Sequence, residues 1–305
     1  MLGMVTGRFT AVVLLILGVA VEETVWAQDE PAPTVVARFE EATALSIDPA
    51  GRLYVADAGA DVVRIMGRDG TERAVLGGAG TRAGQFDRPA DVDPTNGQTL
   101  WVADAGNGRV QRFSEEGLYL EALPVGPAFR EGRDQRALDD GRDGATVRGA
   151  GRPVAVASTS GDETFVLDGR EDAVLKWDDQ RRPERVLGAR GRPGRTLERP
   201  VALALDGTRR LYVADQAAGA VFAFDLFGSL MKRLPISHLP DLRALTIHRK
   251  RLWIVCSGRV YVWAPRRGVT TVHEVDLSAP LVDAARRGDD VFLLTERHLY
   301  RRPSW

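Results

Sequence analysis

The chain has 305 residues, of which 44% are hydrophobic and 27% charged, the composition of an ordinary soluble globular protein. Its formal net charge is −1, so overall charge argues against nucleic acid and membrane lipid as partners. The only cysteine, Cys256, excludes an internal disulfide. Because it lies within an apolar run, we expect a buried thiol there.

The first 27 residues predict a secretory signal peptide, residues 1–27. An apolar run of 11 residues, Ala11–Val21, is shorter than the roughly 20 residues that span a bilayer. Small residues then stand at the positions that a signal peptidase reads, up to Ala27. We expect cleavage after Ala27, an exported protein that is periplasmic or extracellular, and no transmembrane segment in the mature chain. The alternative is an uncleaved membrane anchor.

An apolar strand that ends in an acid or a polar residue recurs along the chain. The six copies end at Asp57, Asp104, Asp168, Asp215, Ser257 and Glu296. The four aspartates are 47, 64 and 47 residues apart (57 to 104, 104 to 168, 168 to 215). A period in this range is typical of a solenoid or a propeller.

Each unit consists of short strands. In the first, the segments “ALSID”, “RLYVAD”, “VVRIM” and “ERAVL” are separated by the turn sequences “PAG”, “AGA” and “GRDG”. Six units of four strands predict an all-β fold, a six-bladed β-propeller of four-stranded blades. A ring is required because a blade buries both of its faces only between two neighbours.

The last unit contains only three strands, and a spare strand precedes the first unit at Thr34–Glu40. We therefore predict that this N-terminal strand completes the last blade and closes the ring, which removes exposed edges. The predicted blades are approximately 42–83, 84–125, 152–188, 197–235, 241–277, and 280–305 together with 34–40, with an insertion at 126–151.

The segment “GQFDRPADVDPTNGQTLWVADAGNGRVQRFSEEG”, Gly84–Gly117, resembles the NHL repeat. The resemblance extends over approximately Thr34 to Trp305 and is weakest in the last two units. It implies a six-bladed propeller similar to those of bacterial exported proteins. NHL propellers also occur in ubiquitin ligases, RNA-binding proteins and a few enzymes, so the fold leaves the function open.

Four repeated acids, Asp57, Asp104, Asp168 and Asp215, occupy one position in successive blades. A short acid at a strand end accepts hydrogen bonds from the backbone amides of the following turn. Acids spaced around a ring cannot share one substrate. We interpret them as structural turn acids.

Enzymes on this fold place their catalytic groups in the central channel, which the first strand of each blade lines. One face of these strands carries mostly small residues: Ala44 and Ser46; Asp91 and Asp93; Ala155 and Ala157; Ala202 and Ala204; Ala244 and Thr246. A metal site needs several converging His, Asp or Glu side chains. Only Asp91 and Asp93 qualify, so we predict no catalytic metal and no cofactor, with a structural calcium at Asp91 as an alternative.

The four histidines lie in the last third of the chain, where we expect them on the surface: His238, His248, His273 and His298. The segment Gly77–Gly84 is rich in glycine, yet it lacks the Gly-Lys-Ser/Thr ending of a phosphate loop and no helix follows it. We interpret this segment as a link between blades.

The links between blades are rich in arginine, which binds carboxylates and phosphates bidentately. The candidate partner-binding residues are Arg82, Arg88, Arg130, Arg133, Arg190, Arg192 and Arg195. In the alternative interpretation these side chains pair with nearby acids and only keep the links soluble.

These observations favour a non-catalytic exported propeller that serves as a protein- or polymer-binding platform in the cell envelope, with a protein or an anionic polymer as partner. The alternative is a channel-site enzyme of the amidating-lyase or lactone-hydrolase type on the same fold. A third hypothesis is a module of a larger envelope assembly that binds through its loops.

Overall fold

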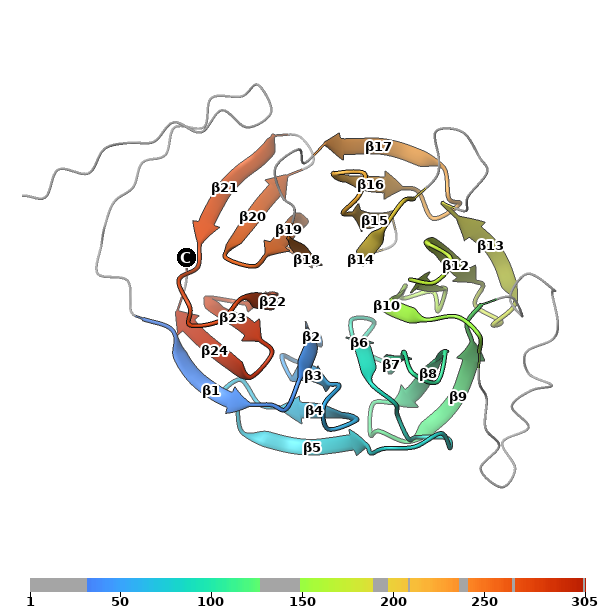
Figure 1. Ribbon diagram of the computed structural model, residues 1–305, viewed down its shortest axis with the longest axis horizontal. Coiled ribbons are helices and arrows are strands. Elements are labelled where there is room, and N and C mark those ends of the chain that lie inside the picture. The colour runs from blue at the N-terminus through green and yellow to red at the C-terminus, as the bar shows by residue number, and fades with distance from the viewer. Residues whose placement is uncertain are drawn as a thin grey trace, which may run out of the picture. The chain divides into compact units, whose positions relative to one another are not determined.

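Six sheets surround a central axis in the computed structural model of the protein (Figure 1). The structure describes residues 32–126, 149–188, 197–207, 209–235, 241–264, 267–303 and 305. Its 24 strands form six four-stranded antiparallel sheets, which confirms the predicted six-bladed β-propeller. No helix within the described residues is long and apolar enough to cross a bilayer. The predicted signal peptide, 1–27, and insertion residues 127–148 lie outside the described residues.

Blades 1 to 5 each consist of four strands consecutive in the chain, with the first strand innermost. Blade 1 contains β2 (Ala42–Ile47), β3 (Leu53–Asp57), β4 (Val62–Met66) and β5 (Glu72–Gly77), and blade 2 contains β6 (Pro89–Asp93), β7 (Thr99–Asp104), β8 (Arg109–Ser114) and β9 (Tyr119–Pro124). Blade 3 contains β10 (Pro153–Ser158), β11 (Thr164–Asp168), β12 (Ala173–Trp177) and β13 (Pro183–Leu187). Blade 4 contains β14 (Pro200–Asp206), β15 (Arg210–Asp215), β16 (Ala220–Phe224) and β17 (Leu230–Pro235), and blade 5 contains β18 (Leu242–His248), β19 (Arg251–Cys256), β20 (Arg259–Ala264) and β21 (Gly268–Glu274).

Blade 6 joins the two ends of the strand order. It contains β22 (Leu281–Arg287), β23 (Asp290–Thr295) and β24 (His298–Pro303), and its outermost strand is β1 (Thr34–Arg38). The strands β1 and β24 pair antiparallel, with Thr34 opposite Arg301 and Arg38 opposite His298. This pairing confirms that an N-terminal strand completes the last blade.

The core lies between adjacent blades rather than within any one of them. The second strands are rich in β-branched and aromatic residues, which favour a strand, and all five residues of β3 are buried. One cluster joins Tyr54 and Val63 of blade 1 to Val102 and Phe113 of blade 2. The other described clusters likewise each join residues of two adjacent blades.

The turns between third and fourth strands pack against the outer strand of the preceding blade. A Cβ atom on Gly70 would clash with Val36 of β1, and one on Gly228 would lie 3.0 Å from Leu187 of β13. Both glycines have positive φ, 81° and 80°, which other residues rarely adopt. Glycine is thus required here both by the backbone conformation and by close contact between blades.

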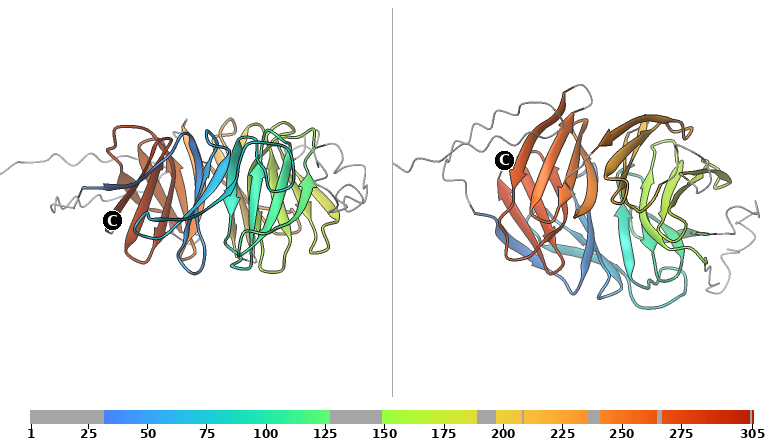
Figure 2. Two further views of the ribbon diagram at one scale, coloured as in Figure 1. Left: turned by 90° about the horizontal axis from the view of Figure 1, so that it is seen from below. Right: turned by 45° about the horizontal axis from the view of Figure 1, so that its top comes forward.

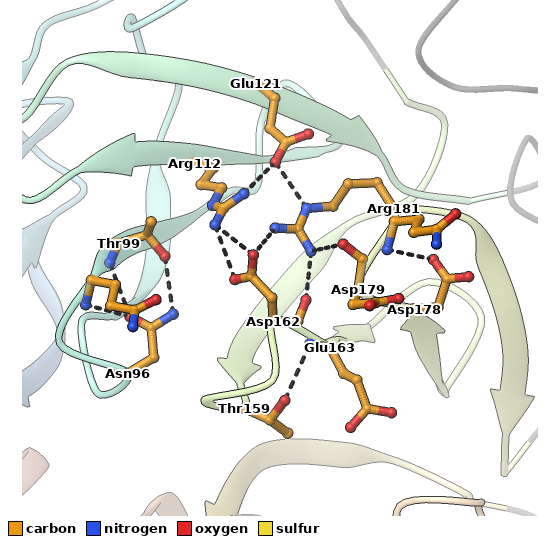
Figure 3. A network of polar contacts seen from close by, with 12 residues as sticks. Asn96, Thr99, Arg112, Glu121, Thr159, Asp162, Glu163, Asp178, Asp179 and Arg181 are labelled. Carbon is orange, nitrogen blue, oxygen red and sulfur yellow. Dashed lines mark hydrogen bonds and ion pairs between the residues drawn. The ribbon is translucent and has the colours of Figure 1, made fainter.

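A charged network links blades 2 and 3 on the same face as these turns (Figure 3). Arg181 bonds to Glu121 of β9 and to Asp162, each at 2.8 Å, and Arg112 of β8 bonds to the same two acids. Both guanidinium groups also lie over the ring of Trp101, at 5.6 Å for Arg112 and 5.2 Å for Arg181. The buried Arg181 therefore has its charge balanced by two carboxylates from different blades.

We predict that a chain beginning at Phe39, which lacks β1, unfolds at a clearly lower temperature than the mature protein. The loss of β1 exposes the edge of β24 and the apolar residues of blade 6. A loss of about 1 kcal/mol shifts the melting temperature by 2–4 °C at this size. The measurement is differential scanning calorimetry, and a chain beginning at Pro33 is the control. Equal melting of the two chains would contradict a role of β1 in closing the ring.

Candidate functional site

Six innermost strands line the central channel, and each contains the same irregularity (Figure 1). Their pairing with the second strand skips one residue after the first pair, as in a β-bulge. In blade 2, Pro89 lies opposite Asp104 and Asp91 lies opposite Ala103, so Ala90 is left out. A bulge re-aims the side chains beside it. The residue after the bulge is alanine in four blades and aspartate in blades 2 and 6.

Asp91 connects two blades through its carboxylate. One oxygen, Oδ1, accepts the N–H of Val92 at 2.8 Å, and the other, Oδ2, accepts the N–H of Val156 in blade 3 at 2.8 Å. The inner edge of β10 has no neighbouring strand, so this N–H would otherwise face the channel without a partner. The carboxylate thus occupies the place of a missing strand.

Asp283 makes the same connection between blades 6 and 1. Its Oδ1 accepts the N–H of Ala284 at 2.7 Å, and its Oδ2 accepts the N–H of Leu45 in β2 at 2.9 Å. Asp283 therefore joins blade 6 to blade 1 at the channel wall. The strand β1 joins the same two blades at the rim.

Asp93 adds a second connection between blades 2 and 3. Its Oδ2 accepts the N–H of Ser158 at 2.6 Å and the hydroxyl of Ser158 at 2.8 Å. Its Oδ1 accepts the N–H of Thr95 at 2.9 Å. All three described carboxylates of the channel wall accept hydrogen bonds from the backbone of a neighbouring blade.

A cavity of about 340 Å³ lies in the channel, towards the end where first strands turn into second strands. Asp91, Asp93 and Asp283 line it together with Ser46 and Thr246. Five apolar residues of the innermost strands also border it: Leu45, Val92, Val156, Leu203 and Leu245. The side chains of the first four belong to core clusters between blades.

Burial shifts the acidity of these carboxyl groups. It raises the pKa of Asp91 to about 8 and that of Asp283 to about 7. The backbone donors lower both pKa values, but less than burial raises them. Burial also raises the pKa of Asp93. At neutral pH the carboxyl of Asp91 is therefore largely protonated, although the channel gives partial access to it.

We predict that the protein loses stability as pH rises from about 5 to about 9. Because the folded-state pKa of Asp91 lies above the ordinary 3.8, the folded protein retains a proton that the unfolded chain releases. This contribution is fully present below the unfolded pKa and is lost as pH rises through the folded pKa. Melting temperatures across this pH range test it. Asp91→Asn should flatten the decline, whereas Asp289→Asn at an exposed turn should leave it unchanged; an equally steep decline in Asp91→Asn would contradict the assignment.

The repeated acids lie far from this cavity, at the ends of the second strands. Each is buried and accepts a hydrogen bond from the backbone of the link that enters its own blade. The acceptor and donor pairs are Asp57 with Glu41, Asp104 with Asp87, Asp168 with Arg152, and Asp215 with Glu198. Asp168 and Asp215 also accept an amide of the following turn. The structure places these four acids in separate blades.

Asp104 has the most extensive set of contacts. Its Oδ2 accepts the guanidinium of Arg109 at 2.8 Å and the amide of Gln111 at 3.0 Å. The Arg109 side chain is 1% exposed, and its Nη2 donates to the backbone carbonyls of Arg82 and Gln85. The pair thus fixes the link between blades 1 and 2.

We predict that Asp104→Ala lowers the free energy of unfolding by about 3–5 kcal/mol, because it leaves the buried guanidinium of Arg109 without its carboxylate. The control is Glu274→Ala, which removes the exposed partner of Arg259 and should cost about 0–1 kcal/mol. Urea denaturation measures both values. Similar costs for the two variants would contradict a structural role of this buried pair.

Two of the candidate partner-binding arginines lie within the described residues. Arg82 and Arg88 are both exposed and belong to the link between blades 1 and 2. The guanidinium of Arg88 pairs with Glu41, and its backbone N–H donates to Asp61 at 2.7 Å. The other five candidates lie outside the described residues: Arg130, Arg133, Arg190, Arg192 and Arg195.

No described histidine lines the channel cavity. His248 ends β18, His273 lies in β21, and His298 begins β24 rather than occupying a turn. His238 lies outside the described residues. Within the part of the chain that the structure describes, no group of three or more His, Cys, Asp or Glu side chains is placed to hold a metal ion. Cys256 is buried and free, as its apolar surroundings predict.

Asp283 is the channel residue that sequence analysis missed. Aligning Leu281–Asp283 with Pro89–Asp91 would have identified it, because both segments place an aspartate two residues after the start of an innermost strand. The sixth unit diverges most from the repeat, so the repeat pattern alone does not mark its first strand.

No family model and no curated protein matches the chain. Solved structures resemble its fold at low sequence identity. A streptogramin B lyase is 11% identical with a TM-score of 0.57, over 85% of this chain and 78% of that one. A catalytically inactive virginiamycin B lyase from Staphylococcus aureus with quinupristin is 8% identical with a TM-score of 0.62, over 89% and 98%. A gluconolactonase from Xanthomonas campestris is 16% identical with a TM-score of 0.60, over 87% and 86%. At these identities the likeness concerns the propeller fold alone.

Proposed function

We propose that the protein is a non-catalytic exported β-propeller that binds a protein or an anionic polymer in the cell envelope. The signal-peptide pattern of residues 1–27 supports export. The ring supplies a rigid support, because each blade is held to its neighbours by apolar clusters and by carboxylate–backbone bonds.

One observation carries the non-catalytic part of this proposal. The three described channel carboxylates, Asp91, Asp93 and Asp283, all accept hydrogen bonds from backbone amides of a neighbouring blade. A general base or a metal ligand needs a free lone pair directed at its substrate or ion. Here both oxygens of each carboxylate already accept a donor of the ring, which leaves fewer lone pairs for a substrate or an ion.

The links between blades are the proposed binding face. Arg88 keeps 57% of its side chain exposed while it pairs with Glu41, and Arg82 is exposed beside it. Guanidinium groups on a rigid surface bind carboxylates and phosphates with little further loss of side-chain freedom. The proposal includes Arg190, Arg192 and Arg195, which lie outside the described residues.

We predict that Arg82→Ser combined with Arg88→Ser weakens capture of the native partner about fivefold. A further variant, Arg190→Ser with Arg192→Ser and Arg195→Ser, should act in the same direction. The effect should be larger at low salt, because exposed charges are screened beyond about 10 Å at 0.1 M. The measurement is capture from a native envelope extract by the immobilised mature chain, with the bound material identified by mass spectrometry.

The matched control is Arg73→Ser with Arg185→Ser, which removes two exposed arginines from the outer strands β5 and β13. Capture by this control should equal that of the unmodified chain, and all variants should melt alike. Undiminished capture by both link variants would move the binding site away from the links.

A channel-site hydrolase or lyase is the second candidate, and the raised pKa of Asp91 favours it because a protonated carboxyl can act as a general acid. The enzymes among the fold neighbours provide assays, namely gluconolactonase activity and lyase activity on a streptogramin B. Turnover that is lost in both Asp91→Asn and Asp283→Asn would establish this candidate and refute the non-catalytic proposal.

A further inference from the structure

A second cavity, of about 450 Å³, lies between blades 5 and 6, and we name it the Trp305 cavity. Residues of the strands β18 to β22 line it, together with the C-terminal residue of the chain, Trp305. Figure 1 marks the C-terminus beside these two blades. The turn that follows β18 contributes Arg249 to the cavity. This turn lies on the face of the ring opposite the links, because each first strand runs from its link to that turn (Figure 2).

Three arginines line the Trp305 cavity: Arg249, Arg251 and Arg286. No Asp or Glu side chain lines it, and none of the three arginines forms an ion pair with a described Asp or Glu side chain. Among the three side chains, only that of Arg286 has a described hydrogen bond, from its Nε to the carbonyl of Gly288 at 3.0 Å. The three arginines outnumber the terminal carboxylate of Trp305, so the lining residues carry a net positive charge, whereas Arg88 and Arg181 elsewhere are paired with carboxylates.

The backbone holds one of these arginines in an unfavourable conformation. Arg249 and Lys250 form the two-residue turn between β18 and β19, with positive φ values of 48° and 63°. Such turns strongly favour glycine, asparagine or aspartate. The corresponding turn of blade 6 has Gly288 at its first position, also with positive φ. Arginine at this position of blade 5 therefore costs backbone strain that glycine avoids.

The inner wall of the cavity is aromatic. The ring of Trp305 is stacked on that of His273 at 4.3 Å and lies 5.4 Å from that of Trp253. Two buried nitrogen atoms of lining residues, Nε1 of Trp305 and Nε2 of His248, have no hydrogen-bond partner within the described structure. A buried donor without an acceptor is destabilising.

We propose that the Trp305 cavity binds a small organic anion. The arginines hold its carboxylate or phosphate group, and its flat or apolar body lies against Trp253 and Trp305. The volume is that of a small-molecule site, which typically combines apolar walls with a few polar groups. This inference goes beyond the proposed binding of a polymer at the links and is independent of it, because the two sites lie on opposite faces.

The test is calorimetric titration of the mature chain with benzoate and phenyl phosphate, together with intrinsic tryptophan fluorescence. Inorganic phosphate probes the charged group alone, and benzyl alcohol probes the ring alone. We expect one of the two aromatic anions to bind one per chain and more tightly than inorganic phosphate, with no binding of benzyl alcohol. The tighter aromatic anion shows whether the natural ligand bears a carboxylate or a phosphate.

The variant Arg249→Gln with Arg251→Gln should weaken binding of that anion by at least about tenfold. Both side chains are exposed, so the variant should fold, and its melting temperature checks this. The matched control is Arg210→Gln, at the same first position of β15 as Arg251 in β19, which should bind as the unmodified chain does.

Failure of both aromatic anions to bind the unmodified chain would overturn the proposal, as would undiminished binding by Arg249→Gln with Arg251→Gln. Binding of inorganic phosphate as tight as that of phenyl phosphate would overturn the role of the tryptophans. The variant Arg82→Ser with Arg88→Ser should bind both probes normally, so failure of partner capture at the links leaves this result unaffected.

Discussion

The fold depends on one constraint: a four-stranded blade has two apolar faces, and neither is covered until the ring is closed. Every core cluster therefore contains residues of two adjacent blades, as where Leu53 of blade 1 packs with Phe292 of blade 6. Closure at the rim comes from β1 and closure at the channel wall comes from Asp283. The C-terminal blade is thus attached to the N-terminal part of the chain both by a strand and by a side chain.

The channel shows how a closed ring provides hydrogen-bond partners for the backbone groups at the inner edge of its blades. Six strands present one edge each to a space too narrow for another strand, so their inward backbone groups lack the partners that a sheet would supply. In two blades an aspartate meets this need, and burial then favours its neutral form while the backbone donors favour its charged form. Raised pKa values are common in catalytic sites. Here the shift follows from the burial of two carboxyl groups that also accept backbone amides of a neighbouring blade.

Periodicity was sufficient to predict the architecture. The repeated strand ending at Asp57, Asp104, Asp168 and Asp215 fixed the number of clear blades, and the missing fourth strand of the last unit located the closure at β1. The same pattern indicated where the repeated acids lie but not what they bind. Their donors are mainly amides of the preceding link, about 16 residues earlier in the chain, and no local turn rule reaches that far.

The two cavities were beyond sequence analysis for different reasons. The channel cavity joins residues of all six blades, and the bulge after the first residue of each innermost strand interrupts the simple alternation of its side chains. The Trp305 cavity joins residues from five strands and the C-terminus. Neither of its histidines can be recognised from the sequence as part of a site. His248 and His273 were expected on the surface, yet each has its ring against a tryptophan. Such groupings depend on how blades 5 and 6 face one another.

The pairing of β1 with β24 also determines when the ring can be completed during synthesis. Thr34 donates its hydroxyl to the carbonyl of Arg301, a contact that spans 267 positions. While the chain is being synthesised, blades 1 to 5 have all of their strands before blade 6 has its last three. The strand β1 must therefore wait, unpaired, until nearly the whole chain has emerged. Contacts of such long sequence separation form slowly. During this interval the nascent protein has an unpaired strand edge. The ring closes only once β24, near the end of the chain, is available to pair with β1.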